Sequence, residues 1–132
     1  MGNIVEILRS KPGFVSLKPA ATQQVEEAEK KLQLRFSGDY RNYVLNLGAV
    51  SFYAHELTGV CASSRLNVAD VTMKERGYTP SVPADWYVVE QLHIDGIVVW
   101  QSADGAIYQT VPNAVPQRIS GSLAEYIATL IK

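Results

Sequence analysis

The clearest alternation of hydrophobic and polar positions lies between Phe36 and Gly48. Ser37 is a suitable N-cap, because its hydroxyl can accept a hydrogen bond from an unpaired amide of the first turn. Gly48 can adopt the left-handed conformation that ends a helix. We therefore predict a helix over residues 37–47 whose half-aromatic face packs on something broad, such as a sheet. Four residues fall on that face at i, i+3, i+4 and i+7: Tyr40, Tyr43, Val44 and Leu47.

Four further helices, one of them partial, are predicted in the first 76 residues and at the end of the chain. Residues 3–10 form a short opening helix, and residues 23–34 a second one that Thr22 can cap. Residues 65–76 indicate a partial helix, because their apolar positions are spread too evenly for one face. Ser122 and Glu125 have the spacing of a capping box and begin the closing helix.

The second half of the chain has the pattern of an antiparallel meander. Two Asp-Gly pairs, Asp95-Gly96 and Asp104-Gly105, separate short apolar and β-branched runs, as in tight hairpins. The predicted strands lie in 50–57, 86–90, 97–100 and 106–109, with an edge strand near 117–119.

This order of elements predicts an α+β fold in a single domain over residues 1–132. We expect one central antiparallel sheet, packed with the N-terminal helices and closed by the C-terminal helix.

The composition of the chain argues against several classes of protein. The formal net charge is −1, so the chain lacks the basic footprint of proteins that bind nucleic acid or an anionic membrane directly. No apolar run approaches the length of a membrane helix, and the N-terminus lacks the blocks of a signal peptide. The single cysteine forbids an intrachain disulfide. We therefore expect a cytoplasmic protein without a cofactor.

One arrangement could support catalysis. His55 and Cys61 lie six residues apart, with Glu56 beside the histidine, and could act as base and nucleophile. The alternative is a small buried thiol and a loop histidine, and we favour it because no signature of a cysteine enzyme surrounds them. His55 and His93 are too few for a zinc site, and no phosphate-binding loop is present. We do not expect an enzyme.

The distribution of charge is more informative than its total. Between Gly77 and Gln117 there is no lysine or arginine. An acidic surface beside aromatic residues could steer and dock a basic partner, although Asp-Gly turns by themselves account for two of the aspartates. The acidic residues of this segment are Asp85, Glu90, Asp95 and Asp104.

Four stretches, in order, resemble the SUKH superfamily of Smi/Knr-like proteins. They are the helix pair Val25–Leu32 and Ser37–Leu45, the segment Ala54–Val60, the hairpin Asp95–Tyr108 and the closing Ser122–Ile127. Gln33 and Ser37 replace a glycine and a proline of the usual pattern, and Leu47-Gly48-Ala49 is a degraded form of its glycine turn.

The resemblance implies an α+β fold and, for most bacterial members, an immunity protein; a minority are eukaryotic regulators. We therefore predict that the chain binds and neutralises a cognate toxin, a basic nuclease domain, as a monomer or weak homodimer. The alternative is a non-enzymatic scaffold module unrelated to a toxin. The residues predicted to contact the partner are Asp85, Trp86, Tyr87, Glu90, Asp95 and Asp104, since aromatic residues are favoured as interface anchors.

Overall fold

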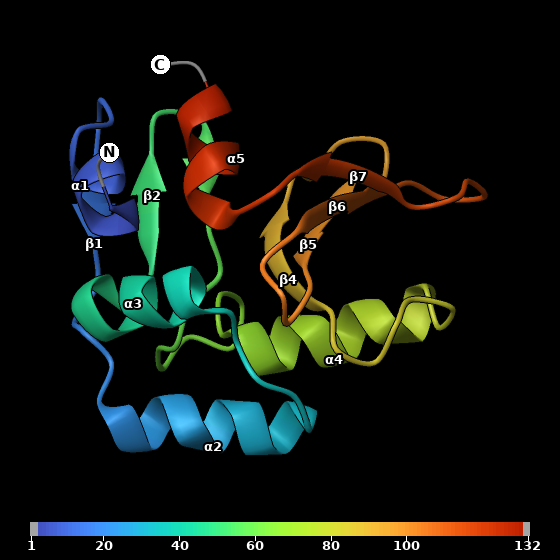
Figure 1. The fold of residues 1–132 in the computed structure, drawn as a ribbon, viewed down its shortest axis with the longest axis horizontal. Helices are drawn as coiled ribbons and strands as arrows, with labels where there is room; N and C mark the ends of the chain where they lie inside the picture. Colours follow the sequence, from blue (N-terminus) through green and yellow to red (C-terminus); the bar gives the residue numbers. More distant parts are fainter. Residues whose placement is uncertain (1–2, 131–132) are drawn as a thin grey trace.

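The computed structural model describes residues 3–130, which form five helices and seven strands (Figure 1). In chain order the elements are α1 (Ile4–Arg9), β1 (Val15–Ser16), α2 (Thr22–Leu32), α3 (Gly38–Leu47), β2 (Val50–Phe52), β3 (His55–Glu56), α4 (Val68–Tyr78), β4 (Tyr87–Gln91), β5 (Val98–Gln101), β6 (Ile107–Thr110), β7 (Gln117–Ser120) and α5 (Leu123–Thr129).

The α+β class and the closing helix are confirmed, but the single sheet is wrong in detail. The strands form two antiparallel sheets, one in the order β1-β2-β3 and the other in the order β4-β5-β6-β7. An isolated bridge between Leu57 and Glu90 joins them. The reason for the division is the length of β3: the chain leaves the ladder after two residues, and only this bridge continues the pairing toward β4.

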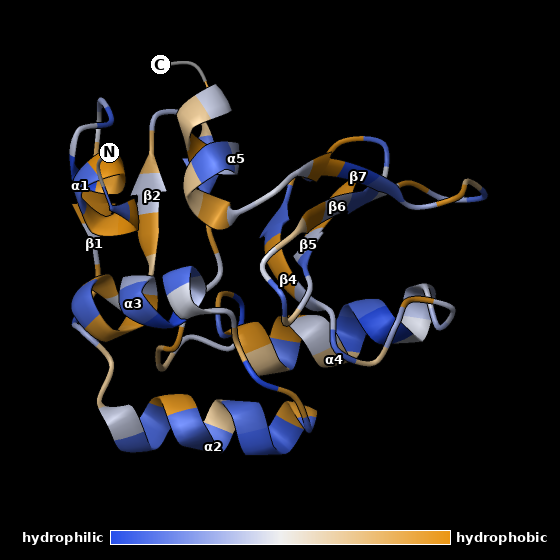
Figure 2. Ribbon diagram, in the orientation of Figure 1, coloured by the Kyte–Doolittle hydropathy of each residue, from blue (hydrophilic) through white to orange (hydrophobic). Residues whose placement is uncertain are grey.

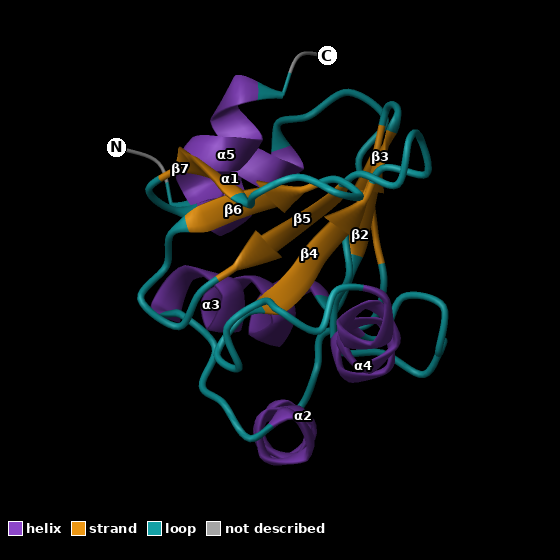
Figure 3. Ribbon diagram, turned by 90° about the vertical axis from the view of Figure 1, so that its right-hand side faces the viewer, coloured by secondary structure: helices purple, strands orange, loops and turns teal. Residues whose placement is uncertain are grey.

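The β4–β7 sheet separates two hydrophobic clusters. Tyr87, Val89, Val99 and Ile107 belong to the main core, together with residues of α1, α3 and α5. The opposite face packs in a smaller cluster with Val71 of α4. Figure 3 shows the strands of this sheet lying next to one another, with α4 seen end-on near β4. The alternating side chains of one sheet thus contribute to two separate cores.

The predicted aromatic face of α3 is confirmed. Its four residues are buried, and the Tyr43 hydroxyl donates to the Thr58 carbonyl at 2.6 Å. Ser37 caps the helix, and Gly48 follows it with φ of +70°. Asp39 also accepts a hydrogen bond from the amide of Leu123 at 2.7 Å. This carboxylate therefore fixes the start of α5 on the start of α3.

The starts of α2 and α4 differ from the prediction. Thr22 is the first residue of α2 rather than its cap, and the side chain of Gln24 instead accepts from the Ala21 amide at 2.8 Å. α4 begins at Val68, because Asn67 accepts hydrogen bonds from the amides of Ala69 and Asp70. In Figure 2 the outer side of α2 is largely hydrophilic, as its run of charges indicates.

The sheet edges are unequal. At β4, Thr72 accepts from the Val88 amide and Thr58 donates to the Val88 carbonyl, so side chains occupy its outer edge. β7 is the other edge, and three of its four residues are exposed. The edge position predicted for 117–119 is therefore confirmed.

Candidate partner-binding surface

The three exposed aspartates of the acidic segment lie at both ends of the β4–β5 pair. Tyr87 pairs with Gln101, so Asp85 and Asp104 lie just beyond the same end. Asp95 lies in the turn at the opposite end, after the pairing of Gln91 with Val98. The structure therefore exposes these carboxylates but does not gather them into one patch.

Two of these aspartates shape turns. Asp95 and Gly96 both have positive φ, 53° and 69°, as a tight hairpin turn requires. The Asp104 carboxylate accepts from the Ser102 hydroxyl and from the Ala106 amide, and these hydrogen bonds lower the pKa of the carboxyl. Both turn assignments from the Asp-Gly pairs are thus supported by backbone geometry.

Trp86, Tyr87 and Glu90 are buried, which corrects their placement on a docking surface. Trp86 stacks on Tyr108 with ring centroids 4.1 Å apart. Tyr87 accepts from the Ser37 amide and donates to the Gln101 side chain. These side chains fill the two faces of the sheet, so a partner cannot reach them in this conformation.

Glu90 is 2% exposed and lies where β3, β4 and α5 meet. Its carboxylate accepts from the Tyr126 hydroxyl at 2.7 Å and contacts Nδ1 of His55 at 2.7 Å. Burial and the neighbouring carboxylate raise the pKa of Tyr126 well above its usual range. The acidic residue predicted to attract a partner therefore joins the two sheets to the last helix.

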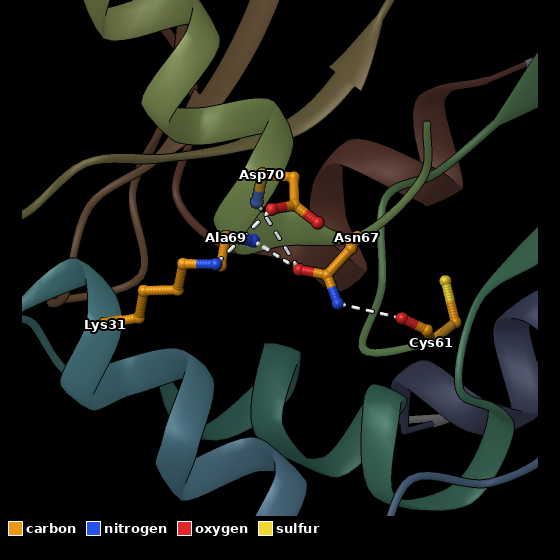
Figure 4. A network of polar contacts seen from close by, with 5 residues as sticks. All are labelled: Lys31, Cys61, Asn67, Ala69 and Asp70. Carbon is orange, nitrogen blue, oxygen red and sulfur yellow. Dashed lines mark hydrogen bonds and ion pairs between the residues drawn. The ribbon is translucent and has the colours of Figure 1, made fainter. Parts of the chain in front are cut away.

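The structure does not join His55 and Cys61 as base and nucleophile. His55 contacts Glu90, whereas the Cys61 thiol contacts the Ser63 carbonyl. Figure 4 shows that it is the carbonyl of Cys61, not its thiol, that accepts from Asn67. Partial burial raises the pKa of the Cys61 thiol, which disfavours the reactive thiolate.

No group of three or more potential metal ligands occurs among residues 3–130. In that same part of the chain, no helix has the length and apolar character needed to cross a membrane.

A groove that the sequence did not predict lies at the Asp95 end of the β4–β7 sheet. We call it the end groove. It has a volume of about 460 Å³ and is lined by the last turn of α4, the β4–β5 turn and the start of the β6–β7 loop. A second hollow of about 540 Å³ shares Tyr78, Thr79, Val111 and Pro112 with it. Its lining side chains include Glu75, Tyr78, Gln91, His93, Ile97 and Pro112.

Large apolar side chains are exposed in the segments that form the end groove and the second hollow beside it. Tyr78 is 73% exposed, Ile94 58% and Val115 81%. In Figure 2 the β6–β7 loop at the far right carries orange, hydrophobic stretches on either side of a hydrophilic tip. Exposed apolar side chains gathered beside a groove are typical of a protein interaction site. The only sequence signal for this region is the absence of lysine and arginine from 77 to 117.

The sequence matches the family model SUKH_5, described as SMI1-KNR4 cell-wall, over residues 1–131. A search of curated proteins gives no match.

Proposed function

The chain belongs to the SUKH_5 family of SMI1-KNR4 proteins, and from this membership we propose that it is an immunity protein that binds a cognate toxin and blocks it. The match over residues 1–131 is the observation that carries the proposal. We further propose that the toxin is a nuclease and that inhibition occurs by direct contact between the two proteins.

The charge of the exposed surface supports a basic partner. Nucleases hold phosphates with lysine and arginine, and the segment from 77 to 117 offers carboxylates without either residue. The exposed carboxylates Asp85, Asp95 and Asp104 would steer such a partner during encounter. The apolar residues around the end groove would supply the contact area that charge alone does not.

The chain should form a complex with the toxin encoded beside its gene. We expect the two proteins to co-purify as a one-to-one complex, and the toxin to lose its activity at an equimolar ratio. Size-exclusion chromatography with light scattering and a nuclease assay measure both results. A non-cognate toxin of the same class is the control. Full toxin activity at saturating protein would contradict the proposal and favour the scaffold alternative.

Replacing Cys61 with alanine should leave inhibition unchanged. The thiol is half-buried, its pKa is raised, and its one polar contact is with the Ser63 carbonyl. We expect the free energy of unfolding to change by less than about 1 kcal/mol and the inhibition curve of the toxin to stay superimposable on that of the unmodified protein. A variant that folds normally but no longer inhibits would favour a catalytic thiol.

A further inference from the structure

The end groove combines apolar walls with one carboxylate, that of Glu75, and one imidazole, that of His93. Tyr78 closes it at the end of α4, and Ile97 and Pro112 line it from the sheet side. Pro112 packs so closely on the β4–β5 turn that a Cβ added to Gly96 would lie 2.8 Å from its Cγ. The turn and the β6–β7 loop therefore support one another, which makes the groove a preformed feature rather than a gap between loose loops.

Glu75 supplies the negative charge of the end groove, and only one of its two carboxylate oxygens accepts a hydrogen bond from the described residues. Its Oε2 accepts from Nε2 of Gln91 at 2.5 Å. Among residues 3–130, none donates a hydrogen bond to its Oε1. A carboxylate beside apolar walls gains most from a cationic hydrogen-bond donor, because neutral donors leave its charge uncompensated.

Within residues 3–130 no cation is paired with this carboxylate. No lysine or arginine of that part of the chain lines the groove, and His93, which does line it, forms no hydrogen bond or ion pair with Glu75. Lys74 and Arg76 flank Glu75 in α4, but successive helical residues point about 100° apart, and Arg76 donates to the Ala84 carbonyl. The charge of the groove is thus complementary to a basic group from outside the chain.

We propose that the end groove receives one arginine side chain of the partner protein. Its aliphatic stem lies along Ile97 and Pro112, its guanidinium donates to the Glu75 carboxylate, and the exposed ring of Tyr78 covers the guanidinium plane. Arginine suits this site because it both stacks on aromatic rings and donates to carboxylates. The identity of the partner rests on the proposed function, since a nuclease toxin presents basic residues where it holds phosphates.

The groove can be tested without a partner. ¹H–¹⁵N spectra of the full chain are recorded with N-acetyl-arginine methylamide and with the citrulline analogue, which has the same stem without the charge. We expect the arginine probe to shift the amides of Gly96, Ile97 and Val98, and expect little shift from citrulline. Glu75→Gln should abolish the difference, whereas Glu27→Gln on α2 should retain it. Equal shifts from both probes, or shifts unaffected by Glu75→Gln, would overturn the proposal.

The toxin complex gives an independent result. We expect Glu75→Gln to weaken toxin binding about tenfold and Tyr78→Ala to weaken it as well, while Glu27→Gln stays within about twofold. A toxin bound equally by the Glu75→Gln variant and the unmodified protein would overturn the arginine site and leave the proposed function standing. If the toxin binds neither the unmodified protein nor any variant, the proposed function is refuted. The spectra would still decide whether the groove takes arginine.

Discussion

Replacing Gly59 with alanine is expected to reduce the free energy of unfolding by about 3 kcal/mol or more. A Cβ at this position would lie 1.9 Å from the carbonyl oxygen of Gly48 and 2.7 Å from the Cβ of Ala49. That carbonyl accepts a hydrogen bond from the Val60 amide at 3.0 Å. The Gly59 amide donates to the Leu66 carbonyl, and the Gly59 carbonyl accepts from the Val68 amide. Because backbone hydrogen bonds hold both sides, the clash cannot be relieved by turning a side chain. Urea unfolding followed by circular dichroism measures the loss.

Gly77 is the matched control for this substitution. It lies in α4, and a Cβ added there would meet nothing within 4 Å. Alanine at this position should stabilise the protein by about 0.5–1 kcal/mol, because glycine loses more backbone entropy than alanine in a helix. A Gly59→Ala variant as stable as the unmodified protein would show that the 48–49 turn does not contact Gly59 as described.

The elements that the sequence predicted well carry their signals locally. α3 has its cap, its apolar spacing and its terminating glycine within twelve residues, Ser37 to Gly48. α4 was predicted less well because it packs on both α2 and β4, so its buried residues occupy more than one side. Val68, Ala69, Val71 and Thr72 are all buried. A helix between two neighbours loses the one-sided pattern on which sequence prediction depends.

The candidate site depends on contacts between distant segments, and this explains why the sequence did not predict it. Glu75 and Pro112 of the end groove are 37 positions apart in the numbering and belong to different elements. The burial of Glu90 could not be predicted either, since its partners His55 and Tyr126 lie 35 and 36 residues away. The sequence showed that the segment is acidic, but only the fold shows which carboxylates remain at the surface.

Glu90→Ala tests whether this residue stabilises the junction of the two sheets or contacts the partner protein. Removing the carboxylate leaves the buried Tyr126 hydroxyl without its acceptor and opens a space at the junction of the two sheets. We expect the free energy of unfolding to fall by about 3 kcal/mol. Glu90→Gln should cost less, because the amide oxygen can still accept from Tyr126. Asp85→Ala, an exposed carboxylate of the same segment, should change stability by less than about 0.5 kcal/mol.

A double-mutant cycle with Tyr126→Phe assigns this loss to the hydrogen bond. Tyr126→Phe removes the hydroxyl and leaves Glu90 with its contact to His55. If the two side chains act together, the double variant should be more stable than the sum of the single losses predicts, by about 1 kcal/mol. Additive losses would show that Glu90 and Tyr126 act separately. A Glu90→Ala variant that keeps its full stability but no longer binds the toxin would return Glu90 to the docking surface, and its burial at the sheet junction would then have to open when the partner binds.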